Sequence, residues 1–186
     1  MAELKNDEFS DIFADEKEKN NSLGGDVFVA ECNLESDLPL FFPEEYIPGN
    51  SERIDCYRHL NSLTSEGETE KFRLQLEDRF GKLPPEAQDL LKVNGLRRAG
   101  RELGMERIIL KRRQLMTYFV SDRNSAYYQS AVFGKILTFM TRHPMRGKIE
   151  EVHGRRRMIL YHVEAIDEAC RLLKEIGMQQ SEMMLQ

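Results

Sequence analysis

The chain has 186 residues, enough for one domain with its own core, and 40% of them are hydrophobic. No apolar run approaches the ~20 residues that cross a bilayer, and the acidic N-terminus lacks a hydrophobic signal region, so we expect a cytoplasmic chain without membrane contact. The cysteines at 32, 56 and 170 lie far apart and form no CxxC pair, which argues against a disulfide framework and a zinc site.

Charge is distributed unevenly along the chain, although the net charge is only −5. Residues 92–157 contain 16 Lys and Arg against 5 Asp and Glu, whereas the rest of the chain contains 11 basic and 27 acidic residues. A basic segment of this kind is typical of nucleic-acid binding. It also fits a solvated surface or a segment that faces the acidic part of the chain, and we favour this interpretation because acidic flanks repel phosphate.

The N-terminal third predicts extended chain followed by a helix. Residues 1–25 are polar and end in Gly-Gly, which predicts a flexible tail or linker. Residues 26–32 have strand propensity, and prolines bracket the aromatic side chains that follow, which predicts a strand and then extended segments. Asn50 or Ser51 can cap a helix that begins there.

The central stretch, residues 72–86, predicts the end of one helix, a stop and the start of the next. Its apolar side chains recur at helical spacing at positions 72, 76, 80 and 83. Gly81 stands where a left-handed helix cap belongs, and Pro84 and Pro85 suit the first turn of a second helix, which Gly104 ends. Asp78 lies in the last turn of the first helix, where the helix dipole disfavours a carboxylate. We therefore expect a cation opposite Asp78.

The C-terminal half contains a weak internal repeat of the form β-β-α. The first unit comprises strands near 106–111 and 115–120 and a helix near 125–142, and the second comprises strands near 148–152 and 157–163 and a helix near 164–176. Short hairpins force antiparallel pairing. We predict an α+β fold: an N-terminal extended segment and helices, then this duplicated unit forming a small antiparallel sheet with helices packed on it. The domain spans 26–176, and 177–186 is a frayed tail.

No motif for catalysis or cofactor binding is found. The sequence has no phosphate-binding glycine loop, no nucleophile elbow and no histidines at ligand spacing, so we expect no active site, cofactor or metal in this chain. The two predicted hairpin turns are basic and exposed at matching positions of the repeat, and they offer contacts to phosphate or to an acidic protein, or simply keep the turns soluble. Their residues are Arg112, Arg113, Arg155, Arg156 and Arg157.

Several short motifs, taken together, resemble one protein family. They are Tyr46-Ile47-Pro48, Arg53 with Tyr57, Asp78-Arg79-Phe80-Gly81-x-Leu83-Pro84, Leu90-Leu91, Leu96-Arg97 and Leu103-Gly104. The chain from about residue 26 to 176 is similar to the C-terminal domain of the bacterial transcription-repair coupling factor (Mfd), and the polar segment before it resembles the tail of that family's translocase motor.

The resemblance implies a function that composition does not show. The family protein is an ATP-driven translocase on double-stranded DNA, with ATP and Mg in an upstream motor. It displaces stalled RNA polymerase and recruits UvrA for nucleotide excision repair. Its C-terminal domain docks on the UvrB-like N-terminal module of the same chain and masks the surface that UvrA uses, so we expect an autoinhibitory, non-catalytic domain. The alternative is a nucleic-acid-binding module that uses the basic 92–157 region.

The resemblance also implies where the docking interface lies. Asp78 matches an acidic position that pairs with arginines of the UvrB-like module, and Arg79 stands beside it in the motif. The family's second acidic position, three residues earlier, is occupied here by Gln75, which can only form hydrogen bonds. The competing interpretation is that Asp78 forms a salt bridge within its own domain, to Arg79 or Arg97.

Overall fold

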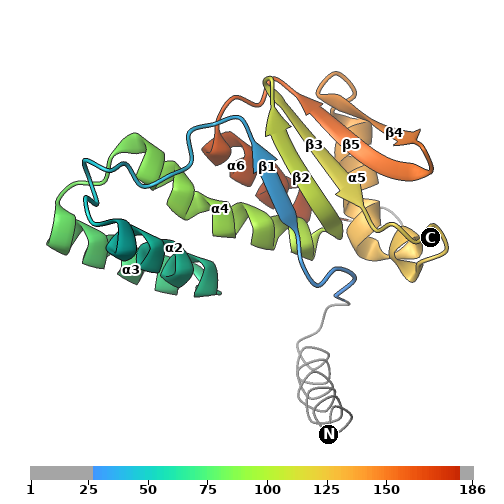
Figure 1. Cartoon of the computed structure of the whole chain (residues 1–186). Coiled ribbons are helices and arrows are strands. Elements are labelled where there is room, and N and C mark those ends of the chain that lie inside the picture. The colour runs from blue at the N-terminus through green and yellow to red at the C-terminus, as the bar shows by residue number, and fades with distance from the viewer. Residues whose placement is uncertain (1–26, 181–186) are drawn as a thin grey trace, which may run out of the picture.

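The chain is described here by a computed structural model that places residues 27–180 (Figure 1). The predicted tail at 1–25, and residues 181–186 of the predicted C-terminal tail, lie outside the described residues. The elements in chain order are β1 (Asn33–Ser36), α2 (Asn50–Ser62), α3 (Glu66–Phe80), α4 (Pro85–Glu102), β2 (Met105–Lys111), β3 (Gln114–Phe119), the short 3-10 helix η2 (Ala126–Gln129), α5 (Ala131–Arg142), β4 (Gly147–Val152), β5 (Arg155–Tyr161) and α6 (Ile166–Gly177).

The strands of the described chain form one five-stranded sheet in the order β1-β2-β3-β5-β4. The predicted repeat is confirmed: β2 and β3 form one antiparallel hairpin, β4 and β5 form the other, and β3 pairs with β5 to join them. The α+β class is therefore confirmed. The sheet is mixed rather than wholly antiparallel, because β1 adds a parallel strand at the edge beside β2.

The edge strand lies later in the chain than its predicted position at 26–32. Its four residues, Asn-Leu-Glu-Ser, pair in register with Arg107 to Leu110 of β2, and Glu35 forms ion pairs with Arg107 and Lys111. An edge strand needs only one set of backbone partners and no fully buried face, so polar residues suffice. The apolar side chains of Val29 and Cys32 are buried in the core without joining the sheet.

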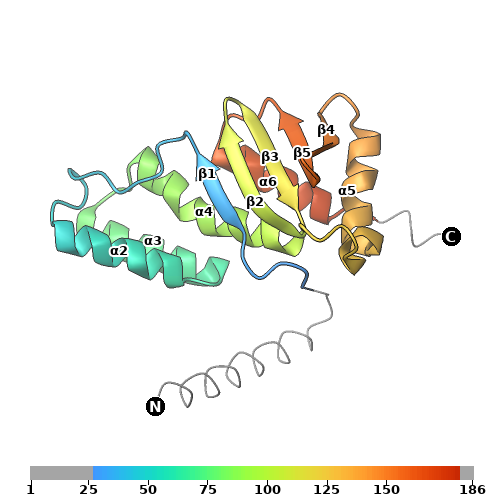
Figure 2. The same ribbon diagram turned by 45° about the vertical axis from the view of Figure 1, so that its right-hand side comes forward.

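Buried side chains within residues 27–180 form two hydrophobic clusters, and α4 belongs to both. The larger cluster lies between the sheet and the helices α4, α5 and α6, which cover one face of the sheet (Figure 1). The smaller one lies between α2, α3 and the first half of α4, at the far end of the molecule from α5 (Figure 2). The side chains of Leu90 and Leu91 belong to the smaller cluster, and those of Leu96 and Leu103 belong to the larger one. One helix therefore fixes the position of α3 relative to the sheet.

Two further boundaries differ from the predictions. The helix expected over 125–142 is divided, because Ser125 caps η2 and Ser130 caps α5, each through its side-chain oxygen. The second hairpin turn consists of His153 and Gly154, whose φ angles are +49° and +76°. The expected basic turn at 155–157 is therefore wrong, since these arginines begin β5. Positive φ at both central residues is what a tight hairpin requires, and glycine adopts it without strain.

Candidate interdomain interface on helix α3

Local sequence fixes both ends of α3. At its start, the Ser65 hydroxyl accepts a hydrogen bond from the Glu68 backbone N–H at 3.2 Å, and the Glu68 carboxylate accepts one from the Ser65 N–H at 3.2 Å. This is a capping box, which satisfies two orphan donors at once. At its end, Gly81 takes a φ of +86° and its N–H donates to the carbonyl of Glu77, so a glycine ends the helix as predicted. Its ψ of −167° differs from the predicted left-handed helical cap and belongs to an extended region that essentially only glycine adopts.

The two faces of α3 have different surroundings. Phe72 and Leu76 are buried against α2 and α4, and the ring of Phe72 lies 4.7 Å from that of His59 on α2. On the opposite side, four side chains are exposed to solvent. We call them the outer face of α3: Lys71, Leu74, Gln75 and Asp78. Because residues three and four apart are neighbours on a helix, Gln75 and Leu74 both lie beside Asp78.

The carboxylate of Asp78 forms no ion pair or hydrogen bond with any residue in 27–180. The two salt bridges proposed within the domain are not formed. Arg79 pairs with Glu52 of α2, and the Arg97 side chain donates to the carbonyl of Cys32 at 2.9 Å. The last turn of α3 therefore presents an unpaired negative charge where the helix dipole is also negative.

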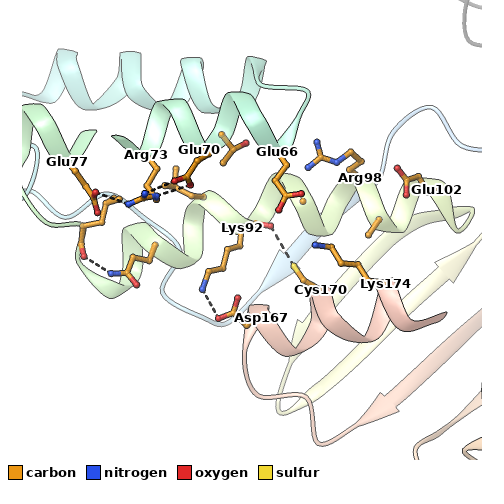
Figure 3. Close-up of a pocket in the computed structure, with 16 residues that line it drawn as sticks. Glu66, Glu70, Arg73, Glu77, Lys92, Arg98, Glu102, Asp167, Cys170 and Lys174 are labelled. Carbon is orange, nitrogen blue, oxygen red and sulfur yellow. Dashed lines mark hydrogen bonds and ion pairs between the residues drawn. The ribbon is translucent and has the colours of Figure 1, made fainter. Parts of the chain in front are cut away.

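Glu77, the neighbour of Asp78, belongs to a different surface. Arg73 donates to both carboxylate oxygens of Glu70, at 2.9 and 2.6 Å, and to Glu77 at 2.8 Å. The hydrogen bond from Arg73 lowers the pKa of Glu70. Figure 3 shows this trio on one wall of a groove of about 610 Å³ between α3, α4 and α6, where Lys92 of α4 also reaches Asp167 of α6 at 2.7 Å. These paired charges leave Asp78 as the carboxylate of this turn that lacks a partner within the described chain.

Arg79 holds the end of α3 against α2. Besides its ion pair with Glu52, its guanidinium lies 5.2 Å from the centre of the Phe80 ring. Phe80 in turn packs beside Tyr46, whose hydroxyl donates to the Gly81 carbonyl at 2.9 Å. Arg79 thus acts on the orientation of the turn that carries Asp78, and its charge is already matched within the domain.

Leu74 is a member of the outer face that the sequence-based argument missed. Its side chain is 53% exposed, one helical turn before Asp78. The signal was present in the spacing, because Leu74 lies two residues from both Phe72 and Leu76 and so falls on the opposite side of the helix from that buried stripe.

The predicted basic contacts are placed apart and are largely neutralised. Arg112 and Arg113 form the first hairpin turn, with φ angles of +52° and +61°. Arg113 pairs with Glu164, and the Arg112 backbone N–H donates to Asp37 at 3.0 Å. Their prediction as an exposed turn is confirmed, but the turn is tied to acidic side chains.

The arginines at 155–157 alternate between the two faces of the sheet, as neighbouring residues of a strand must. Each has an acidic partner: Arg155 pairs with Glu106 at 2.8 Å, Arg156 with Glu151 at 3.6 Å and Arg157 with Glu150 at 2.5 Å. The guanidinium of Arg156 also lies 4.4 Å from the centre of the Tyr128 ring. The five predicted basic residues therefore do not form one phosphate-binding patch.

Residues 27–180 contain no group of three or more His, Cys, Asp or Glu side chains placed to hold a metal ion. The three cysteines are free, and burial raises the pKa of the Cys32 thiol to about 11. None of the helices in this part of the chain is both long enough and apolar enough to cross a bilayer.

A mixed five-stranded sheet covered on one face by helices defines an α+β domain. The TRCF domain family matches residues 36–130, just over half of the chain. The chain therefore belongs to the TRCF domain family.

Comparison with individual proteins agrees with this assignment. The transcription-repair-coupling factor of Escherichia coli strain K12 is 31% identical over 83 residues, which cover 45% of this chain and 7% of that protein. That of Rickettsia prowazekii strain Madrid E is 29% identical over 124 residues, which cover 67% of this chain and 10% of that protein. The chain thus spans about a tenth or less of the length of these curated relatives.

A solved structure shows which part of the relatives the fold corresponds to. The crystal structure of the C-terminal domain of transcription-repair coupling factor matches with a TM-score of 0.63, covering 79% of this chain and 93% of that one at 14% identity. The predicted family resemblance is confirmed, and the chain has the fold of the C-terminal domain of a transcription-repair coupling factor.

Proposed function

We propose that this chain is a regulatory domain that docks through the outer face of α3 on a UvrB-like module of the same protein and masks the surface to which UvrA binds. In this proposal the rest of the protein is an ATP-dependent translocase on double-stranded DNA, which displaces stalled RNA polymerase and holds ATP and Mg in its motor. The chain itself regulates and does no chemistry.

The observation that carries the proposal is the unpaired carboxylate of Asp78. Its position in the last turn of α3 is unfavourable for a negative charge, by a few tenths of a kcal/mol up to about 1 kcal/mol. An arginine supplied by a docked partner removes this cost and forms a charge-assisted hydrogen bond. Neighbouring charges are satisfied within the domain, Glu77 by Arg73 and Arg79 by Glu52, so Asp78 is the carboxylate of this turn that remains to be matched.

The composition of the outer face suits a contact that must open. It combines one carboxylate, the amide of Gln75 and the half-exposed Leu74. Interfaces between domains of one chain are small and polar compared with permanent ones. An effector that binds the open state more tightly by a few kcal/mol is enough to release such a contact.

The test is Asp78→Arg in the full-length protein, with UvrA binding and ATPase rate as readouts. Reversing the charge opposes an arginine on the partner, so we expect UvrA affinity and ATPase rate to rise by about fivefold or more. The matched control is Glu175→Arg, because Glu175 is also an exposed carboxylate two residues before the last residue of a helix, but on α6. We expect the control to behave as wild type.

Two results contradict the proposal. One is an Asp78→Arg protein that folds normally and leaves both readouts unchanged. The other is a control that raises both readouts equally, because the effect would then come from added positive charge and not from the outer face of α3.

A further inference from the structure

A second surface, on the side of α4 that faces the segment before β1, has a different character. There a cleft of about 260 Å³ is lined by three arginines of α4, Arg97, Arg98 and Arg101, and by the chain segments at 30–32 and 61–64. We call this the α4 arginine cleft. It contains one carboxylate, that of Glu31, and no aromatic side chain.

None of the three arginines has a carboxylate partner in the part of the chain that the structure describes. Arg97 uses its Nε–H to bind the carbonyl of Cys32 at 2.9 Å, and Arg98 uses one terminal nitrogen to bind the carbonyl of Thr64 at 2.8 Å. The Arg101 side chain is exposed and forms no hydrogen bond or ion pair within residues 27–180. The backbone thus orients two guanidinium groups while leaving most of their N–H donors free.

This arrangement contrasts with that of the arginines in the sheet and its connecting loops. At positions 107, 113, 123, 155, 156 and 157 each guanidinium pairs with a carboxylate. The favourable helix dipole accounts for a cation in the last turn of α4, where Arg101 lies, but Arg97 and Arg98 precede that turn. The guanidinium groups of Arg97 and Arg98, which have no carboxylate partner within residues 27–180, therefore need another explanation.

We propose that the α4 arginine cleft binds the phosphate groups of a nucleic-acid strand. The guanidinium fork matches a phosphate bidentately and remains charged at all physiological pH values. Arg97 and Arg101 lie one helical turn apart, with Cβ atoms roughly 5–6 Å from each other, so each can take a different phosphate oxygen pair. Because no aromatic side chain is available to stack on bases, the contact reads the backbone and not the sequence.

The site is independent of the proposed docking through α3. It lies on α4, it uses cations where the outer face of α3 uses a carboxylate, and none of its residues belongs to that face. It also differs from the five arginines predicted as basic contacts from the sequence. Except for Arg112, each of these forms an ion pair with a glutamate: Glu164, Glu106, Glu151 or Glu150.

The test measures binding of the 186-residue chain to a fluorescent single strand and to the corresponding duplex, at salt concentrations from roughly 50 to 200 mM. We expect log K to fall linearly with log salt concentration. Arg101→Gln should make the slope shallower by about one, and Arg97→Gln with Arg101→Gln by about two, since each arginine that contacts a phosphate releases about one counterion. Arg113→Gln is the control and should leave the slope unchanged.

The single variant Arg101→Gln keeps the test decisive if the double variant fails to fold. The Arg101 side chain forms no hydrogen bond or ion pair within residues 27–180, so the folded chain loses no such contact when it is replaced. Absence of binding at the lowest salt concentration overturns the proposal, and so does an Arg101→Gln slope equal to that of wild type. Inorganic phosphate serves as a competitor: if it displaces the strand at equal phosphate concentration, the site takes free phosphate and the nucleic-acid assignment is wrong. A polyglutamate peptide that binds when neither strand nor duplex does overturns it equally.

Discussion

Gly104 lies directly against the ring of Tyr127, so closely that a Cβ atom built on Gly104 would come within 2.1 Å of a ring carbon. Gly104 has a φ of +75° and links α4 to β2, and Tyr127 is fully buried with its hydroxyl donating to the Leu103 carbonyl at 2.7 Å. The aromatic ring thus fixes the exit angle of the helix that joins the two hydrophobic clusters.

Gly104→Ala is therefore expected to destabilise the chain. The alanine must adopt a left-handed backbone conformation and also displace a buried ring, and we expect a loss of about 3 kcal/mol in the free energy of unfolding. Gly95→Ala in the middle of α4 is the control, because its Cβ would meet only an Arg98 nitrogen at 3.9 Å. That change should stabilise by about 0.5–1 kcal/mol. Urea unfolding measures both, and equal effects would contradict the assigned role of Gly104.

The Tyr127 hydroxyl makes a separate contribution. Burial raises the pKa of this hydroxyl, so it remains a protonated donor at all accessible pH values. Tyr127→Phe keeps the ring but leaves the Leu103 carbonyl without this donor, and we expect a loss of about 1 kcal/mol. Tyr161→Phe, at a half-buried tyrosine whose hydroxyl forms no hydrogen bond within residues 27–180, should change the unfolding free energy much less. If Tyr161→Phe lowers the unfolding free energy as much as Tyr127→Phe does, the hydrogen bond to Leu103 is not the cause of the loss.

The capping box at the start of α3 predicts a dependence on pH. Hydrogen bonds from the Thr64 and Ser65 backbones lower the pKa of the Glu68 carboxyl from its usual 4.5. Because the pKa is lower in the folded state, the unfolded chain binds the proton first as the pH falls. The stabilisation by this carboxylate is therefore complete above pH 4.5 and is lost below it, as the pH approaches the pKa of the folded state.

Glu68→Gln isolates this charge, since glutamine keeps the shape and an acceptor for the capping box. We expect wild type to be more stable than Glu68→Gln at neutral pH, and we expect the difference in urea midpoint to shrink as the pH falls below 4.5. A difference that stays constant over this range would show that the carboxylate charge is not what stabilises the turn.

Much of the fold was predictable because local rules and tertiary packing agree. The apolar stripe of α3 stands as expected because it follows from helical periodicity. A glycine ends α3 and Pro85 starts α4, also as expected, because each position follows from the conformational preference of one residue. Strand β1 lies later in the chain than predicted. The reason is that pairing at a sheet edge is decided by the partner strand β2 and by the ion pairs of Glu35, not by the strand propensity of residues 26–32.

The candidate sites were less predictable, because a sequence does not reveal which charges have partners. Asp78 was singled out by the helix dipole, yet its exposure and lack of an ion pair required the surroundings of α3. The same limit applied to the basic residues. Arg157 in β5 and Arg101 in α4 look alike in the sequence, but of the two only Arg157 forms an ion pair within the described chain.

Leu74 provides the last prediction, which rests on the proposed docking of α3. A leucine that is 53% exposed beside Asp78 can bury apolar surface against a partner without supporting its own core. Leu74→Ser in the full-length protein should therefore weaken masking and raise UvrA affinity by about fivefold, corresponding to roughly 1 kcal/mol of lost apolar contact. The unfolding free energy of the domain should change by less than about 0.5 kcal/mol, as expected for an exposed position.

Leu137→Ser separates this effect from a general loss of surface hydrophobicity, because Leu137 is 40% exposed on α5, at the opposite end of the molecule from α3 (Figure 2). We expect its UvrA affinity to equal that of wild type. If Leu74→Ser leaves affinity unchanged while Asp78→Arg raises it, the contact is purely electrostatic and its strength should fall as salt concentration rises. If both raise affinity, the apolar and charged side chains dock together, and high salt should leave part of the masking intact.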